Sequence, residues 1–286
     1  MSAILKLVQG TKEWHDHRAH SRNASETPAV LGVSPWQTPY SLWLLRTGRK
    51  VQEVTPAMTH GTVLEPAARA AYEKLTGSVM EPLVLTEGDY SASLDGITLD
   101  GELILEIKCP FKGQTSELWK SVATGEVPAH YWWQIEHQLM VSGAAMAHLY
   151  VFDGTEGLLL EVKPKPEVWP LITKAWEEFQ KYLDSDTPPP LTDKDVRLRE
   201  DQEWSIAAKA YIAAKSQADV TAAALDTAKA ALIALVLHTS ESGAGVKVTR
   251  FWKAGSVEYK KIAVLKGLDL EQYRGKAREE VRITVA

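Results

Sequence analysis

The segment that most constrains the fold of this chain is residues 103–108, which reads Leu-Ile-Leu-Glu-Ile-Lys. A nearly continuous apolar run of this length is typical of a strand buried in the middle of a sheet. Because side chains alternate between the two faces of a strand, Glu106 and Lys108 point to one face and Ile107 points to the other, into the core. The sequence therefore predicts a charged pair on a strand that is otherwise buried.

A second acid precedes this strand. Asp95 lies eleven residues before Glu106, and the Asp100-Gly101 pair between them favours a tight hairpin turn. The hairpin would return Asp95 to the side of Glu106 and Lys108. Burying two carboxylates and an ammonium costs free energy unless a cation is bound. A Mg2+ between the two acids would offset that cost, so the group is a candidate metal site. The alternative is a charged hairpin solvated on an outer face, although such a face should alternate more regularly.

Two predicted helices carry further polar side chains toward the same site. Residues 60–76 are rich in alanine, a strong helix former, and Glu65 near the start of this helix can face a cleft. Residues 129–141 form the second helix, on which Gln134 and Gln138 are four residues apart and share a face. For Gln138, a solvated polar helix face is an equally good interpretation.

Helices and strands alternate in the remainder of the first 186 residues, which indicates an α/β protein. The further predicted elements are a strand at 92–94, a hairpin of 148–153 with 157–162, and helices at 115–124 (with Thr115 as N-cap) and 167–183.

The motifs follow one another in an order that resembles a known family. They are Gly61-x-x-x-Glu65, Ser93-Leu-Asp95-Gly, Glu106-Ile-Lys108-Cys-Pro and Tyr131-x-x-Gln134-x-x-x-Gln138. Over roughly residues 10–185 the chain is similar to the YqaJ-type viral recombinases, which are relatives of lambda exonuclease within the PD-(D/E)xK nuclease superfamily. The resemblance implies an α/β fold with a restriction-endonuclease-like core, in which helices flank a central mixed sheet.

The resemblance also implies roles for individual residues. Asp95, Glu106 and the backbone carbonyl of Ile107 would hold one Mg2+, and Glu65 would help to hold a second ion, with Mn2+ able to substitute. Lys108 would orient the attacking water. The catalytic set implied in this way is Glu65, Asp95, Glu106, Lys108 and Gln134.

A second set of residues matches the 5′-phosphate pocket of lambda-type enzymes. Arg18 and Ser25 have the arginine-to-serine spacing of that pocket, and Ser93 and Gln134 match its other two members. An arginine fork can bind a phosphate through two parallel hydrogen bonds, which is a physical reason for digestion to start at 5′ ends.

Together these assignments predict a Mg2+-dependent deoxyribonuclease. It would digest one strand of linear double-stranded DNA in the 5′→3′ direction from 5′-phosphorylated ends, and leave 3′ single-stranded overhangs for phage-type homologous recombination. The resemblance also implies a single-strand annealing protein as partner and a homo-oligomer. Two alternatives stay open: a structure-specific endonuclease or single-strand nuclease on the same fold, and a DNA-end-binding module without catalysis.

Composition limits the other classes of protein. The 286 residues carry a net charge of -5, which speaks mildly against a protein that coats DNA. The single cysteine, Cys109, excludes an intrachain disulfide and a zinc or iron–sulfur site built from cysteines. Since the chain has neither a long apolar run nor a signal-peptide pattern, we expect no membrane association. The single cysteine fits a reducing cytosol, and the resemblance to viral recombinases implies that of a bacterial host, with the gene carried by a phage or prophage.

Composition also divides the chain into three predicted regions. They are a nuclease domain at 1–186, a proline-rich linker at 187–199 and an accessory region at 200–286. In the accessory region, the alanine-rich residues 200–237 predict one or two long helices.

The last part of the accessory region is predicted to form a hairpin of 246–252 with 257–262, followed by a short helix at 265–278. Basic and aromatic residues alternate on this hairpin, so it could contact DNA, although a solvated or partner-packed hairpin fits the pattern equally well. The candidates for accessory DNA contacts are Trp36, in an exposed Ser/Pro loop, and Lys247, Arg250 and Lys253.

Overall fold

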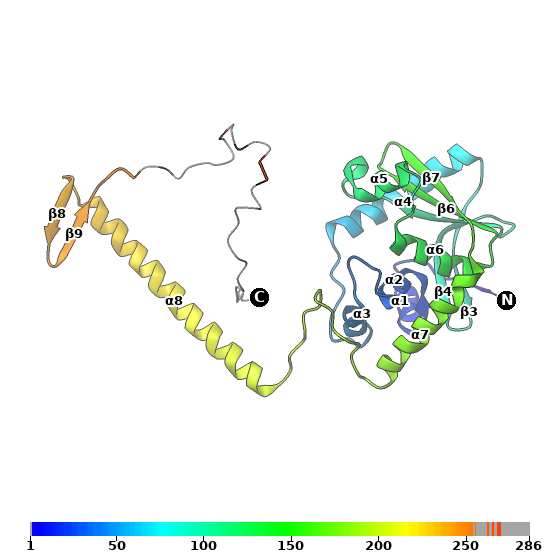
Figure 1. Ribbon diagram of the computed structural model, residues 1–286, viewed down its shortest axis with the longest axis horizontal. Helices are drawn as coiled ribbons and strands as arrows, with labels where there is room; N and C mark the ends of the chain where they lie inside the picture. Colours follow the sequence, from blue (N-terminus) through cyan, green and yellow to red (C-terminus); the bar gives the residue numbers. More distant parts are fainter. Residues whose placement is uncertain (1, 254, 256–261, 263–264, 266–267, 270–286) are drawn as a thin grey trace. The chain divides into compact units, whose positions relative to one another are not determined.

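The computed structural model describes residues 2–253, 255, 262, 265 and 268–269. The chain divides into two compact units, Met1–Arg197 and Leu198–Ala286. Figure 1 shows the first unit as a sheet with helices around it, and the second as a long helix followed by a small hairpin. In the described part of the chain, no helix combines the length and the apolar character needed to cross a membrane.

Seven strands among the described residues form one sheet in the first unit. They are β1 (Ala3–Leu5), β2 (Arg22–Asn23), β3 (Glu81–Glu87), β4 (Tyr90–Ile97), β5 (Leu103–Lys108), β6 (Met146–Phe152) and β7 (Gly157–Val162). The spatial order is β1-β3-β4-β5-β6-β7, with β2 paired to β4. The β5–β6 and β2–β4 pairs are parallel and the others antiparallel, which confirms the predicted mixed sheet.

Helices cover both faces of the sheet, which explains why β5 is apolar on both sides. They are α1 (Lys12–His20), α2 (Thr27–Val30), α3 (Pro39–Arg46), α4 (Pro56–Thr76), α5 (Glu117–Ala123), α6 (Ala129–Ser142) and α7 (Trp169–Asp184), with 3₁₀ turns η1 (Ala24–Glu26), η2 (Gly113–Thr115) and η3 (Pro166–Val168). On one face, Ile135 of α6 packs in the same cluster as Ile104 of β5. On the other face, Tyr72 of α4 packs with Leu105 and Ile107. Burial of Ile107 in this core confirms the predicted alternation of β5.

Local capping sets the ends of the helices. α4 ends at Gly77, whose φ of 75° lies in the left-handed region that glycine tolerates best. The helix predicted at 115–124 begins later than expected, because Ser116 rather than Thr115 is its N-cap. The Ser116 side chain accepts a hydrogen bond from the backbone N–H of Trp119 at 3.1 Å. Thr115 instead lies in η2.

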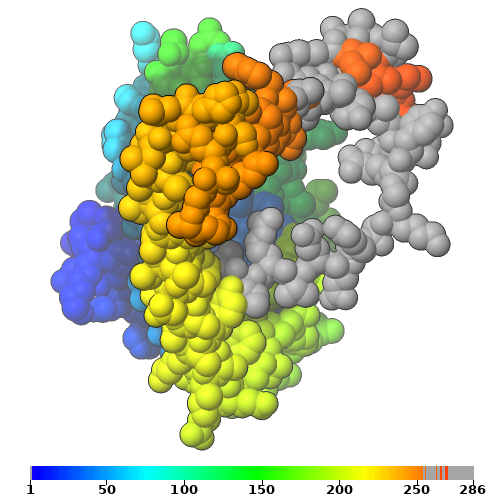
Figure 2. All heavy atoms as spheres, turned by 90° about the vertical axis from the view of Figure 1, so that its left-hand side faces the viewer, coloured from blue at the N-terminus to red at the C-terminus, as the bar shows by residue number. Residues whose placement is uncertain are grey.

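The second unit contains one long helix, α8 (Gln202–Ala234), where the sequence predicted one or two. The Asp201 side chain caps its N-terminus by accepting a hydrogen bond from the backbone N–H of Trp204 at 2.9 Å. None of the α8 residues is buried by the part of the chain that the structure describes. In the space-filling view, α8 is the yellow-to-orange column of atoms (Figure 2).

A small hairpin follows α8. It pairs β8 (Ser240–Gly243) with β9 (Val246–Thr249). The two residues between the strands, Ala244 and Gly245, have φ angles of 47° and 81°. Positive φ at both central residues is the mark of the tight turn that suits the twist of a two-stranded hairpin.

This pairing differs from the predicted one. The prediction left residues 238–245 between the long helix and the hairpin, whereas the partner of β9 lies within them. The two-residue turn closes the hairpin at once, and a short closure loses less chain entropy than a longer one. Most of the predicted second strand at 257–262, and most of the predicted helix at 265–278, lie outside the described residues.

Candidate active site

The acids of the sequence motif lie where two strands separate. The described residues of β4 and β5 pair at two positions, one of which joins Gly96 to Leu105. Asp95 is the residue at which β4 leaves β5. Its Oδ2 accepts a hydrogen bond from the backbone N–H of Ile107 at 2.7 Å, so the Asp95 carboxylate links the two strands where they separate. We call this site the fork; it comprises Asp95, Glu106 and Lys108. Asp95 Oδ1 has no hydrogen-bond partner among the described residues.

Glu106 lies beside this fork and is held from two directions. Glu106 is 2% exposed. Oε1 accepts a hydrogen bond from Gln134 Nε2 at 2.7 Å, and Oε2 accepts one from Gln138 Nε2 at 2.6 Å. The Lys108 ammonium forms an ion pair with Oε1. The two glutamines thus share one face of α6, and Gln138 is a buried donor to Glu106 rather than part of a solvated face.

The two carboxylates at the fork, Asp95 and Glu106, outnumber its single ammonium, Lys108. Burial raises the pKa of Asp95 well above its usual value, and the negative charge of Glu106 raises it further. Burial lowers the pKa of Lys108, but the charges of Glu106 and its neighbours outweigh this effect and leave the pKa above its usual value. Lys108 is therefore a permanent cation, and its ammonium also lies 5.1 Å from the ring centre of Tyr131.

Glu65 approaches the fork from α4 together with an arginine that sequence reasoning missed. Arg69 Nη2 lies 2.8 Å from Glu65 Oε1, and Arg69 Nε donates a hydrogen bond to the Asp95 carbonyl oxygen at 2.7 Å. Burial raises the pKa of Glu65, Arg69 lowers it, and Glu106 raises it again. Glu65 and Glu106 therefore feel one another's charge. The signal for Arg69 was its position four residues after Glu65 on a helix.

The oxygen ligands at the fork fit a hard divalent cation. They are the carboxylates of Asp95 and Glu106 and the carbonyl of Ile107, the donor types that Mg2+ and Mn2+ prefer. The unpartnered Oδ1 of Asp95 and the repulsion between the two acids both favour a cation there. Within the described residues, no group of three or more His, Cys, Asp or Glu side chains is arranged to hold a metal ion. Glu65 is instead paired with Arg69.

Three of the predicted phosphate-pocket residues, Arg18, Ser25 and Ser93, form a second cluster around Trp14, whereas Gln134 bonds to Glu106 at the fork. Arg18 Nη2 donates to Ser25 Oγ at 3.1 Å, and its guanidinium lies 4.7 Å from the ring centre of Trp14. The Trp14 indole N–H donates in turn to Ser93 Oγ at 2.9 Å. Ser93 is two residues before Asp95 on β4, so this cluster adjoins the fork. Trp14 is a second residue that sequence reasoning missed.

A cleft of about 440 Å³ connects the two clusters, since both Ser25 and Gln134 line it. Trp36 forms part of its wall and is 73% exposed, as expected from its loop. The Trp36 ring stands edge-on to His130, with 4.8 Å between ring centres. An aromatic surface therefore borders the opening of the cleft.

Comparison with known proteins agrees with these motifs. Residues 13–145 match the family model of the YqaJ-like viral recombinase domain. Over 188 residues the chain is 27% identical to the uncharacterized protein YqaJ of Bacillus subtilis (strain 168). Residues 13–145 are therefore similar to the YqaJ-like viral recombinase domain. The match to YqaJ covers 62% of this chain and 58% of the relative.

The fold of this chain is also similar to that of solved exonucleases. The alkaline exonuclease LHK-Exo of Laribacter hongkongensis has a TM-score of 0.53 and 24% identity, over 62% of this chain and 94% of that one. A crystal structure of LHK-Exo in complex with dAMP gives the same values. The shared fold is a central mixed sheet flanked by helices.

The predicted accessory DNA-contact residues of the C-terminal region lie outside residues 13–145, which match the family model. Lys247 is on β9, and Lys253 follows it; both are exposed. Arg250 donates hydrogen bonds to the carbonyl oxygens of Val236 at 3.0 Å and Ile233 at 3.3 Å. It therefore caps the end of α8, and its contact with DNA stays a prediction, as do those of Lys247 and Lys253.

Proposed function

We propose that this chain is a metal-dependent exonuclease that digests one strand of linear double-stranded DNA in the 5′→3′ direction. It would start at 5′-phosphorylated ends and leave 3′ overhangs. The observation that carries this proposal is the fork, where Asp95, Glu106 and Lys108 meet beside a cleft that also reaches Ser25. The fold shared with the alkaline exonuclease LHK-Exo supports a nuclease.

The residues of the fork have separate tasks in this proposal. Asp95, Glu106 and the Ile107 carbonyl would hold Mg2+ or Mn2+, with Glu65 near a second ion. Such an ion, when bound, activates water and offsets charge at a phosphate. Lys108, always protonated, would hold the attacking water or the developing negative charge. Gln134 and Gln138 fix the Glu106 carboxylate, so its oxygens need no reorganisation during the reaction.

The direction of digestion would come from the second cluster. Arg18 and Ser25 offer a cation and a hydroxyl near the cleft, and a terminal phosphate is the anion that matches an arginine fork. Ser93 and Gln134 would complete the pocket, and Trp36 could stack on the end of the duplex. A single-strand annealing partner, a homo-oligomer and a site of action in a bacterial cytoplasm belong to the same proposal.

Digestion of end-labelled duplex DNA tests the polarity. With Mg2+ present, we expect the 5′ label to be released early and the 3′ label late, because the chain would enter from the 5′ end. EDTA should abolish both. A supercoiled circle, which has no ends, is the control and should stay intact. Early release of the 3′ label, or cutting of the circle, would contradict an exonuclease of this polarity.

Loss of the Arg18 side chain tests the pocket. We expect Arg18→Gln to slow digestion of 5′-phosphorylated ends about tenfold and to slow digestion of 5′-hydroxyl ends far less. The reason is that only the phosphorylated end forms a charge-assisted hydrogen bond with Arg18 that the substitution can remove. The measured quantity is the ratio of the two rates. Arg49→Gln is the matched control, because Arg49 pairs instead with Asp186 at 2.8 Å. Equal rates on both ends in the unaltered protein would disprove the pocket.

A further inference from the structure

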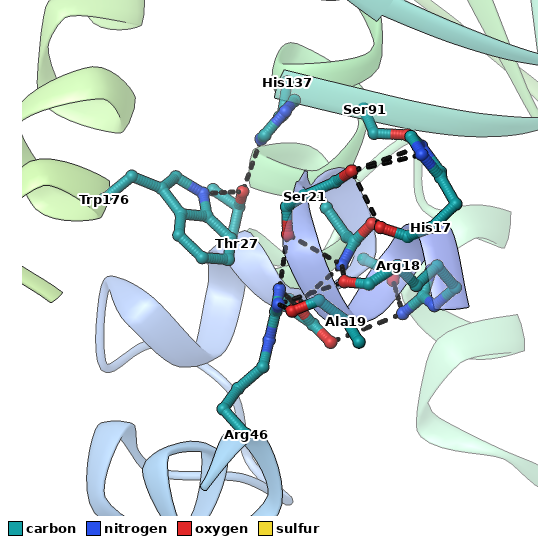
Figure 3. Close-up of polar contacts among 12 residues, drawn as sticks. His17, Arg18, Ala19, Ser21, Thr27, Arg46, Ser91, His137 and Trp176 are labelled. Carbon is teal, nitrogen blue, oxygen red and sulfur yellow. Dashed lines mark hydrogen bonds and ion pairs between the residues drawn. The ribbon is translucent and has the colours of Figure 1, made fainter. Parts of the chain in front are cut away.

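Arg18 belongs to a group of largely buried polar side chains, of which only Asn23 is fully buried. We call it the Glu26 cluster; it comprises Arg18, Asn23, Glu26 and Arg46. The exposed fractions of the Arg18, Glu26 and Arg46 side chains are 21%, 17% and 9%. Figure 3 shows the Arg46 side chain reaching from α3 toward the end of α1, the helix that carries Arg18. The cluster therefore joins the predicted phosphate-binding arginine to the interior of the domain.

The carboxylate of Glu26 is shared unequally between the two arginines. Arg46 Nη2 is in direct ion-pair contact with Oε2, and Asn23 Nδ2 donates to the same oxygen at 3.1 Å. Arg18 Nη2 lies 3.5 Å from Oε1, at the outer limit of a hydrogen bond. The negative charge of Glu26 is thus held mainly by Arg46.

Arg46 is fixed in this position by the backbone at the end of α1. Its Nη1 donates to the carbonyl oxygens of Arg18 at 3.0 Å and Ala19 at 2.8 Å, and its Nη2 donates to that of Ser21 at 2.6 Å. These carbonyls lie at and just beyond the C-terminal end of α1, where helix carbonyls need partners from outside the helix. Asn23 Nδ2 also donates to those of Arg18 and Ser21, so Arg46 and Asn23 together cap this end and hold Arg46 beside Glu26.

The charges of the cluster do not balance. Two guanidinium groups face one carboxylate, so one positive charge is left over. Arg18 carries this excess, since its closest partner is the neutral hydroxyl of Ser25 at 3.1 Å. Ser25 is exposed and lines the cleft. The excess charge therefore lies next to the opening through which an anion would enter.

We propose that Arg46 is a positioning residue for a terminal phosphate: by binding Glu26, it prevents that carboxylate from neutralising Arg18. This inference rests on the proposed function, because the phosphate in question is the 5′ end of a DNA strand. Without Arg46, Glu26 would pair one-to-one with Arg18 and compete with the phosphate. Glu26 therefore competes with the phosphate for Arg18, and Arg46 limits this competition by binding the Glu26 carboxylate.

A charge-balance cycle tests this inference. The readout is the ratio of digestion rates on 5′-phosphorylated and 5′-hydroxyl duplexes, together with the ratio of their binding affinities in EDTA, measured by fluorescence anisotropy. We expect Arg46→Gln to lower both ratios about tenfold, because Glu26 becomes the partner of Arg18. Glu26→Gln alone should keep them at or above the original values. The double variant should recover most of the loss, since it removes the competitor as well.

A purely structural role for Arg46 gives the opposite pattern. If Arg46 only caps α1, the double variant removes a further contact and should be no better than Arg46→Gln. Failure of the double variant to recover would overturn the inference, as would unchanged ratios in a folded Arg46→Gln. If Arg46→Gln does not fold, Glu26→Gln decides alone, and a tenfold fall in its ratios would overturn the inference. Arg49→Gln is the control and should leave all ratios unchanged.

The two proposals fail in different ways. If the unaltered protein digests and binds 5′-phosphorylated and 5′-hydroxyl duplexes equally well, the phosphate pocket and this inference are both overturned. An unaltered protein that prefers the phosphate, with variants that ignore the predicted cycle, leaves the proposed function intact and overturns only the role of Arg46.

Discussion

Replacing Asp95 by asparagine is expected to abolish cleavage without weakening the fold. Asparagine keeps the shape of the side chain and can still accept the hydrogen bond from the Ile107 N–H. It removes one of the two carboxylates that would hold the metal. Activity should fall about a thousandfold or more, because an ion at this position contributes several kcal/mol to the reaction. Digestion of linear duplex DNA with Mg2+ measures the loss.

The same substitution should stabilise the metal-free protein at pH 8. Burial and the charge of Glu106 raise the pKa of Asp95, so the folded state binds a proton more tightly than the unfolded chain. The free energy of unfolding therefore falls as the pH rises from the usual pKa toward the raised one, and the charged Asp95 is unfavourable above it. Asparagine carries no such charge, so the melting temperature in EDTA should rise.

Glu117→Gln is the matched control, because the Glu117 side chain is 89% exposed and pairs only with Lys120 at the surface. We expect it to change neither activity nor melting temperature appreciably. Activity of Asp95→Asn within tenfold of the unaltered protein would contradict a role for Asp95 in holding the metal. Loss of activity together with a large fall in melting temperature would show that Asp95 supports the fold instead.

Acid should destabilise the protein through His137. The Trp176 indole N–H donates to Thr27 Oγ1 at 2.9 Å, and Thr27 Oγ1 lies 2.5 Å from His137 Nδ1. Because an indole can only donate, the threonine hydroxyl accepts from Trp176; the direction of its bond with His137 Nδ1 depends on the histidine tautomer, and Nε2 has no hydrogen-bond partner among the described residues. His137 is fully buried, and burial lowers its pKa to about 3.

The sign of the effect follows from the lowered pKa. The unfolded chain binds a proton at His137 near the usual histidine pKa of 6.5, whereas the folded protein does so only near 3. The free energy of unfolding therefore decreases as the pH falls through this window, by up to about 1.4 kcal/mol per pH unit from this residue. We expect His137→Gln, which cannot titrate, to lose that part of the slope. Urea unfolding between pH 4 and 7 measures it.

His15→Gln provides the control for this experiment, because it removes an imidazole that is exposed on α1 rather than buried. Equal slopes in His137→Gln and the unaltered protein would mean that His137 is not kept neutral by its surroundings. The substitution is also expected to lower stability at pH 7, since it disturbs a buried hydrogen bond to Thr27.

The parts of the site that depend on alternation along one strand could be predicted from the sequence. Glu106 and Lys108 share a face of β5, and a hairpin returns Asp95 beside them, because strand geometry and turn residues fix both. Gln134 and Gln138 share a face of α6 for the same kind of reason. In each case the signal lies within a few residues of the side chain concerned, or across one short turn.

The contacts that could not be predicted join residues far apart in the chain. Trp14 donates to a serine 79 positions away, and Arg69 donates to a carbonyl 26 positions away. Neither residue type predicts a hydrogen-bond acceptor far away in the sequence, since tryptophan usually packs in the core and arginine usually lies at the surface. Arg46 is the strongest case, because its acceptors are backbone and carboxylate oxygens that it reaches only after α1 and α3 have packed.

The fork between β4 and β5 has a consequence for how relatives of this chain can be found. The positions of the two acids are set by the point where the strands part, while the loop beyond it is a turn closed by the Gly101 N–H on the Thr98 carbonyl at 2.9 Å. Adding equal numbers of residues to both strands at that turn would lengthen the hairpin and leave Asp95 and Glu106 where they are. A search for a fixed interval between the acids would therefore discard true relatives, whereas a search that aligns strand register would retain them.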